Sequence, residues 1–165
     1  MPHPRRRRYV SSHRRRVLVV EDDDSFAEAL RELLEADGRL VVAGRARDGQ
    51  EAIELAEALR PDVVLMDIVL PVLDGVEATR EVRRRQPTIA VVAVTGSEYE
   101  ERALEMRDAG AVDFVRKGRL GPDLVEIVVA ATHRRRRRRG RGLQRAAEQR
   151  SHPTSLKDDD ELEDQ

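Results

Sequence analysis

The sequence predicts an α/β fold, a doubly wound five-stranded parallel sheet with five helices that cover both of its faces. Two observations lead to this prediction. Short apolar runs rich in β-branched residues alternate with segments of helical periodicity throughout residues 16–132. The apolar runs are also continuous, without a polar residue at every second position, which is typical of strands buried on both faces of a parallel sheet.

Five apolar runs are the predicted strands: Val17–Val20, Leu40–Ala43, Val63–Met66, Ile89–Val94 and Val112–Val115. Connections between parallel strands are almost always right-handed, so few strand orders are compatible with this alternation. We expect the order 2-1-3-4-5 of flavodoxin-like sheets.

The predicted helices are marked at both ends. Four of them begin at a residue that can cap the helix, followed three positions later by Glu: Ser25 with Glu28, Asp48 with Glu51, Asp74 with Glu77, and Ser97 with Glu100. Pro122 suits the first turn of the fifth helix. Residues that end helices follow the first four: Gly38, Pro61, Pro87 and Gly110.

The charges of the chain are segregated, although its net charge is only −1. Residues 1–16 carry seven Arg and no acid, and residues 133–150 carry nine Arg against Glu148. We therefore predict one domain at residues 16–132, a disordered basic arm at 1–15, and a disordered tail at 133–165 that is Arg-rich and then acidic. The tails are interpreted as solvated linkers. The alternatives are electrostatic contact with nucleic acid, an anionic membrane or an acidic partner, or folding back over the acidic domain.

Composition and motifs argue against several classes of protein. The chain has no cysteine, which excludes disulfide frameworks, thiolate metal sites and cysteine nucleophiles. Its apolar runs are too short to span a membrane or to form a secretory signal, so we expect a cytoplasmic protein with no membrane span. No Gly-x-Gly-x-x-Gly or Walker motif follows the first predicted strand, as a nucleotide-dependent enzyme of this architecture would require.

Polar residues follow the predicted strands at the edge where parallel sheets bind ligands. In the expected order the first and third strands are neighbours, which brings Glu21, Asp22 and Asp67 into one cleft. Clustered carboxylates repel one another unless a cation lies among them, and Mg²⁺ is a hard ion that takes such oxygen ligands. Thr95 and Lys117 follow the fourth and fifth strands. A hydroxyl, an ammonium and a metal together suit a phosphoryl group, with a carboxylate as its acceptor.

These residues lie in five separated motifs: Val17–Asp23, Asp62–Asp67, Pro71 with Leu73–Gly75, Val94–Thr95, and Ala109–Ala111 leading to Phe114–Lys117. With motifs at these spacings, residues 16–132 resemble the receiver domain of bacterial two-component response regulators. One departure is Gly96, where the family commonly has Ala.

The resemblance implies a role for each residue of the cleft. Asp67 would be the phosphoacceptor. The cofactor would be Mg²⁺, held directly by Asp22 and Asp67, with Glu21 helping through water and the backbone carbonyl of Val69 completing the site. Thr95 and Lys117 would hold the phosphoryl oxygens, and Thr95 would change conformation together with Phe114 on activation.

Some residues in and near the cleft are also compatible with ordinary structural roles. Asp23 and Asp24 are interpreted as capping or solvated acids, because two acids after the first strand suffice for Mg²⁺. Lys117 is one of only two lysines in an Arg-rich chain, and this favours a role for its compact charge.

The sequence therefore predicts a stand-alone response regulator, a phosphoacceptor and not an enzyme with turnover. Its expected partners are a sensor histidine kinase or phosphotransfer protein, and a downstream protein that binds the face formed by the fourth helix, fifth strand and fifth helix. The sequence leaves open whether the protein forms a homodimer when it is phosphorylated. The alternative is a nucleic-acid-associated regulator in which the Arg-rich tails bind DNA or RNA under control of the receiver.

Overall fold

The computed structural model describes residues 13–96, 101–121 and 123–133. Its strands are β1 (Arg15–Val20), β2 (Leu40–Ala46), β3 (Val63–Asp67), β4 (Ala90–Thr95) and β5 (Asp113–Arg116). Its helices are α1 (Asp24–Glu35), α2 (Gly49–Leu59), α3 (Gly75–Arg85), α4 (Arg102–Asp108), the short 3-10 helix η2 (Lys117–Arg119), and a last helix at 123–133.

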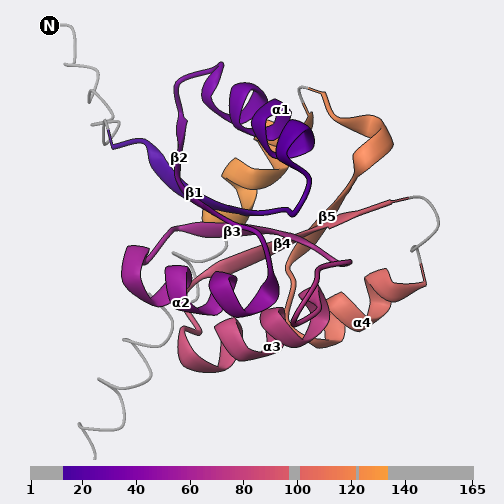
Figure 1. Cartoon of the computed structure of the whole chain (residues 1–165). Coiled ribbons are helices and arrows are strands. Elements are labelled where there is room, and N and C mark those ends of the chain that lie inside the picture. Colours follow the sequence, from indigo (N-terminus) through magenta and orange to yellow (C-terminus); the bar gives the residue numbers. More distant parts are fainter. Residues whose placement is uncertain (1–12, 97–100, 122, 134–165) are drawn as a thin grey trace, which may run out of the picture.

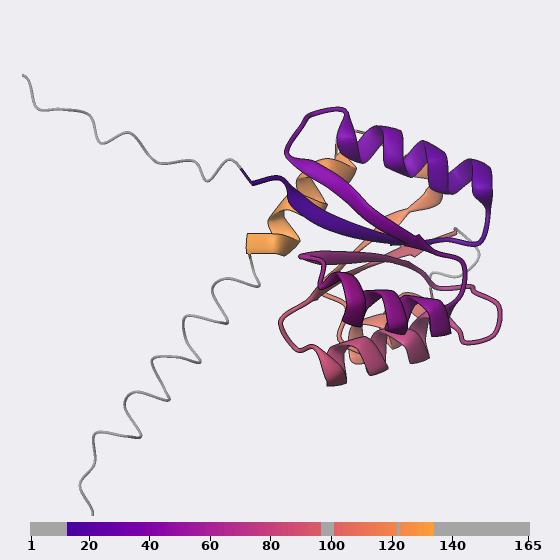
Figure 2. The same ribbon diagram turned by 60° about the vertical axis from the view of Figure 1, so that its left-hand side comes forward.

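The five strands form one parallel sheet in the order β2-β1-β3-β4-β5, which confirms the predicted fold. Helices α1 and 123–133 cover one face, and α2, α3 and α4 cover the other (Figures 1 and 2). Successive residues of a strand point to opposite faces, so each central strand contributes to two cores. Leu18 and Val20 of β1 belong to the core beneath α2 and α3, whereas Val17 and Val19 belong to the core beneath α1 and the last helix.

The helix starts agree with the sequence in two cases and differ in one. Asp48 and Asp74 cap α2 and α3, with carboxylates that accept hydrogen bonds from backbone N–H groups of the first turn. The prediction that Ser25 caps the first helix is wrong. Asp23 takes this position in an extended conformation and accepts from the Phe26 N–H at 2.7 Å, which places Ser25 inside α1. Ser97 and Pro122 lie outside the described residues.

The helix ends follow the predicted stops. Arg60 adopts a left-handed conformation (φ 47°) after α2, immediately before Pro61. Gln86 ends α3 immediately before Pro87, and Gly110 has a φ of 111° after α4. A positive φ allows the chain to leave the helix axis sharply, which Gly does without steric cost.

Val72 lies in a strained turn of the loop that follows β3. Its φ is 66°, and the Leu73 N–H donates to the Pro71 carbonyl at 2.7 Å, which closes a three-residue γ-turn around it. A β-branched residue in this conformation costs of order 1–3 kcal/mol, and Val72 is 84% exposed, so little packing compensates.

We expect Val72→Gly to raise the melting temperature by several degrees, because glycine adopts the positive φ without strain. Thermal unfolding followed by circular dichroism checks this. Val69→Gly is the matched control, since Val69 lies in the same loop and has no positive φ; it should lower the melting temperature. An equal decrease in both variants would show that the turn is not strained.

Among the described residues, no helix is both long and apolar enough to cross a bilayer. Residues 1–12 and 134–165 lie outside the description, so the predicted arm, tail and domain limits stay predictions. The same holds for the interpretation of the tails as solvated linkers and for the alternative of nucleic-acid contact.

Candidate functional site

Three carboxylates meet at the carboxyl-terminal edge of the sheet. Glu21 and Asp22 follow β1 and Asp67 ends β3, and these two strands are paired neighbours with Val20 opposite Met66. One carboxylate oxygen from each residue lies within 4.8 Å of the others. Glu21 and Asp67 are almost completely buried, at 1% and 4% exposure, whereas Asp22 is exposed. The predicted acidic cluster is therefore present.

Lys117 inserts its ammonium between the two buried acids. Its Nζ donates to Glu21 Oε2 at 2.8 Å and to Asp67 Oδ2 at 2.7 Å. The same atom lies 4.7 Å from the centre of the Phe26 ring, whose face attracts cations. Lys117 lies 96 positions after Glu21 in the sequence, and in the fold it neutralises part of the charge of the two acids.

The protonation of this cluster is shaped by burial and by Lys117. Burial raises the pKa of Glu21 above its usual value, against the hydrogen bonds that Lys117 and the Asp23 N–H donate to it. Burial alone would lower the pKa of Lys117, but its hydrogen bonds to Asp67 and Glu21 raise it. Lys117 therefore stays charged at neutral pH.

The donor set fits a magnesium ion. With all groups ionised, three carboxylates and one ammonium leave a net charge of −2, which one divalent cation would neutralise. Carboxylate oxygens are the ligands that this ion prefers, and an exposed member such as Asp22 leaves room for the water ligands that it retains.

Other predicted site residues lie around the cluster. The Val69 N–H donates to Asp67 Oδ1 at 3.2 Å, which holds that carboxylate at the end of β3. Thr95 ends β4 and is 2% exposed, and its hydroxyl donates to the Gly96 carbonyl at 2.8 Å. Phe114 lies on β5, at 37% exposure, with the Arg107 guanidinium of α4 5.4 Å from its ring centre. The roles predicted for these residues stay predictions.

The two remaining acids of the β1–α1 loop have structural partners. Asp23 caps α1, and Asp24 forms ion pairs with Arg45 and Arg47. Neither belongs to the acidic cluster, which confirms their interpretation as capping or solvated acids.

An ion pair that the sequence did not indicate connects this edge of the sheet to α4. Asp74, the cap of α3, also accepts from Arg102 Nη2 at 2.8 Å across 28 positions of the chain. Burial opposes ionisation of Asp74, but hydrogen bonds from the Glu77 N–H and from Arg102 lower its pKa below the ordinary 3.8.

Asp74→Asn should reduce the free energy of unfolding by about 0.5–1 kcal/mol at pH 7, since both partners are partly exposed and Asn retains the capping oxygen. A carboxyl with a lowered folded-state pKa stabilises the protein above its unfolded pKa, and this contribution is lost as the pH falls through the folded value. The difference between wild type and Asp74→Asn should therefore shrink below about pH 4. Urea unfolding between pH 7 and pH 3 measures it, and a pH-independent difference would contradict the ionic role of Asp74.

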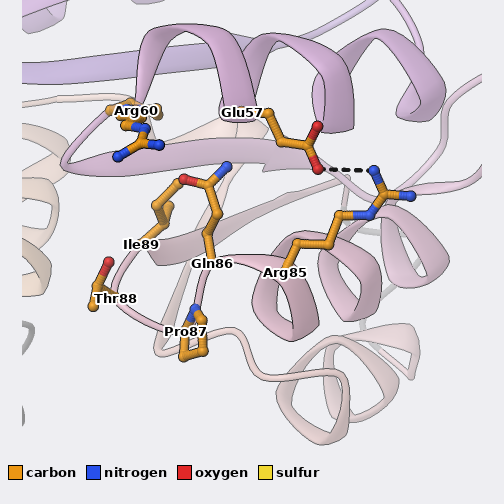
Figure 3. A pocket seen from close by; sticks show the side chains of 8 residues that line it. Glu57, Arg60, Arg85, Gln86, Pro87, Thr88 and Ile89 are labelled. Atoms are coloured by element: carbon orange, nitrogen blue, oxygen red, sulfur yellow. Dashed lines mark hydrogen bonds and ion pairs between the residues drawn. The ribbon is translucent and has the colours of Figure 1, made fainter.

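A separate hollow of about 620 Å³ lies at the opposite edge of the sheet (Figure 3). Its lining comes from the α2–β3 and α3–β4 connections, and the Glu57–Arg85 ion pair of 2.8 Å forms part of its wall. The five residues of β3 separate it from the acidic cluster by roughly 16 Å. It is therefore not part of the site around Asp67.

Known proteins are similar to this chain in sequence and in fold. A family model described as the response regulator receiver domain matches residues 17–129. The chain is 44% identical over 93 residues to protein-glutamate methylesterase/protein-glutamine glutaminase 2 of Photobacterium profundum. It is 45% identical over 95 residues to protein-glutamate methylesterase/protein-glutamine glutaminase 4 of Myxococcus xanthus. The matches cover 56% and 57% of this chain but 24% and 27% of those proteins, so the chain spans about a quarter of the length of these relatives.

Two solved structures show the same likeness. One is the response regulator domain of Thermotoga maritima CheB, with 34% identity, a TM-score of 0.67, and coverage of 73% of this chain and 98% of that one. The other is a two-component response regulator of the LuxR family from Aurantimonas, with 31% identity, a TM-score of 0.66, and coverage of 73% and 86%. Together with the acidic cluster and its bridging lysine, these matches establish that the chain belongs to the response regulator receiver domain family.

Proposed function

We propose that this chain acts in the cytoplasm as a switch that accepts a phosphoryl group on Asp67 in a Mg²⁺-dependent reaction. The donor is a sensor histidine kinase or a phosphotransfer protein. The observation that carries the proposal is the Lys117 ammonium, hydrogen-bonded to both Asp67 and Glu21 inside the buried acidic cluster. An ammonium held beside the acceptor carboxylate can neutralise the negative charge of the phosphoryl oxygens once the phosphoryl group is attached there.

In this reaction a carboxylate oxygen of Asp67 attacks phosphorus, the bond from phosphorus to the donor imidazole nitrogen breaks, and an acyl phosphate forms. Asp22, Asp67 and the backbone carbonyl of Val69 would hold the metal, with Glu21 helping through water. Mg²⁺, when bound, supplies positive charge for the phosphoryl oxygens. The Thr95 hydroxyl leaves the Gly96 carbonyl and donates to a phosphoryl oxygen, while Lys117 holds another.

The output is a change in the face formed by α4, β5 and the last helix. Thr95 ends β4, the strand paired with β5, where Phe114 is half-exposed beside Arg107. Leu104 of α4, at 64% exposure, adds an exposed apolar side chain to the surface formed by α4 and β5. We propose that Thr95 and Phe114 move together and that a downstream protein, or a second phosphorylated copy, binds this face.

The methylesterase and glutaminase activities belong to the full-length relatives, of which this chain matches about a quarter. The chemistry proposed for this chain is limited to its own phosphorylation and dephosphorylation.

Intact mass after incubation with Mg²⁺ and a small acyl phosphate tests the proposal. The wild type should gain one phosphoryl group only when the metal is present, and Asp67→Asn should gain none. Asp108→Asn is the matched control, because Asp108 is an exposed acid on α4, away from the cluster, and it should be phosphorylated like the wild type. An adduct that persists in Asp67→Asn would contradict the assignment of the acceptor, and no adduct in the wild type would contradict the proposed function.

A further inference from the structure

We propose that Arg45 is a positioning residue for the magnesium site, because its guanidinium fixes the backbone that carries Glu21 and Asp22. The inference rests on the proposed function, since it concerns the metal that phosphorylation requires. It adds a residue of β2 to a site otherwise built from β1, β3, β4 and β5.

Arg45 faces this site because of an irregularity in the pairing of β1 with β2. Val17 lies opposite Val42, but Leu18 lies opposite Gly44, so β2 contains one extra residue, Ala43, at this point. Side chains alternate between the two faces of a sheet, and a shift of one residue reverses every side chain beyond it. The bulge therefore gives Arg45 the same orientation as its partner Val19, toward α1, instead of the α2 side.

On the α1 face the Arg45 guanidinium contacts the β1–α1 loop at several points. Its Nε and Nη2 both donate to the Glu21 carbonyl, at 3.1 and 2.9 Å, and Nη2 also donates to the Asp22 carbonyl at 3.2 Å. Nη1 donates to Asp24 at the start of α1. One planar fork thus holds three positions of the loop from which the two carboxylates extend, and only 24% of the side chain is exposed.

These contacts are made to the backbone carbonyls of Glu21 and Asp22, so Arg45 acts on the position of the metal ligands more than on the charge of their carboxylates. Mg²⁺ requires a near-octahedral arrangement at short distances, so a loop that samples several conformations binds it poorly. A guanidinium charge near the site repels a divalent cation. The two effects have opposite signs: loss of positioning weakens metal binding, whereas loss of the charge alone strengthens it.

The test is a Mg²⁺ titration of the 165-residue chain, followed by two-dimensional NMR through the well-dispersed amide signals, which come from the folded molecules. Arg45→Met should raise the dissociation constant roughly tenfold, the size typical of removing a partner that orients metal ligands. Arg45→Lys should raise it similarly, because an ammonium keeps the charge but cannot reproduce the fork. Arg47→Met is the matched control, since among the described residues Arg47 pairs with Asp24 as Arg45 does but does not contact the two carbonyls. Its affinity should stay within twofold of the wild type.

Unchanged or tighter binding in Arg45→Met would overturn the proposal, as would wild-type affinity in Arg45→Lys. A similar loss in Arg47→Met would also overturn it, because the pairing with Asp24 would then be sufficient. These outcomes concern Arg45 alone as long as the wild type binds Mg²⁺ and is phosphorylated on Asp67. A wild type that binds no Mg²⁺ would instead overturn the proposed function and this inference together.

Discussion

Lys117→Met is expected to lower the free energy of unfolding by about 3 kcal/mol in the absence of divalent metal. The substitution leaves Glu21 and Asp67 facing each other with no cation between them, and both are almost completely buried. Removing one partner of a buried ion pair costs more than the pair contributes, because the remaining charge stays desolvated. Methionine has a similar length, so the packing against Phe26 changes little.

Mg²⁺ is expected to reverse much of this loss. A ligand at 100 times its dissociation constant stabilises the folded state by about 2.7 kcal/mol, and the variant site, with one cation fewer, should bind the metal more tightly than the wild type. Urea unfolding in EDTA and in excess Mg²⁺ measures both effects. Arg119→Met, which removes an exposed cation from the same 3-10 helix, is the control and should change stability by less than about 0.5 kcal/mol.

Equal stability of Lys117→Met and the wild type in EDTA would show that the two acids are not both ionised in the folded protein. The pKa of Glu21 is raised, so a proton on Glu21 is the alternative to the Lys117 ammonium as the group that neutralises the pair of acids. The dependence on pH distinguishes these two ways of neutralising the acids: the loss of stability in Lys117→Met should decrease as the pH falls and Glu21 becomes protonated.

The sequence predicted features that depend on local chemistry. The strands are built on short apolar runs rich in Val, and the caps at Asp48 and Asp74 accept from N–H groups no more than three residues away. The acidic cluster could also be predicted, because the strand order alone places the ends of β1 and β3 side by side.

Features that depend on three-dimensional packing were missed. Three Asp and one Ser follow Glu21 in succession, and each could cap a helix, so the local sequence does not single out Asp23 as the cap of α1. Nothing in the sequence of β2 indicates the bulge at Ala43, so the orientation of Arg45 could not be predicted. The Asp74–Arg102 pair joins residues 28 positions apart, and Arg102 was one of many arginines.

Gly75→Ala is expected to destabilise the protein by about 3 kcal/mol and to slow phosphorylation of Asp67. Gly75 is the first residue of α3, and its N–H donates to the Ile68 carbonyl at 2.9 Å. A Cβ at this position would lie 2.0 Å from the Asp67 carbonyl oxygen and 2.9 Å from the Ile68 Cα, both of them backbone atoms that cannot rotate away. The backbone that carries the phosphoacceptor would have to move.

Helix propensity alone predicts the opposite sign, because replacing glycine by alanine stabilises a helix by up to about 1 kcal/mol. The direction of the change therefore decides between propensity and the backbone contact. Gly121→Ala is the matched control, since a Cβ there meets no atom within 4 Å, and its stability should equal that of the wild type or exceed it slightly. Urea unfolding and the rate of adduct formation by mass spectrometry measure the two effects. If Gly75→Ala were as stable as Gly121→Ala, the close approach of α3 to the end of β3 would not constrain Asp67, and the acceptor would have to be positioned by Lys117 and the Val69 N–H alone.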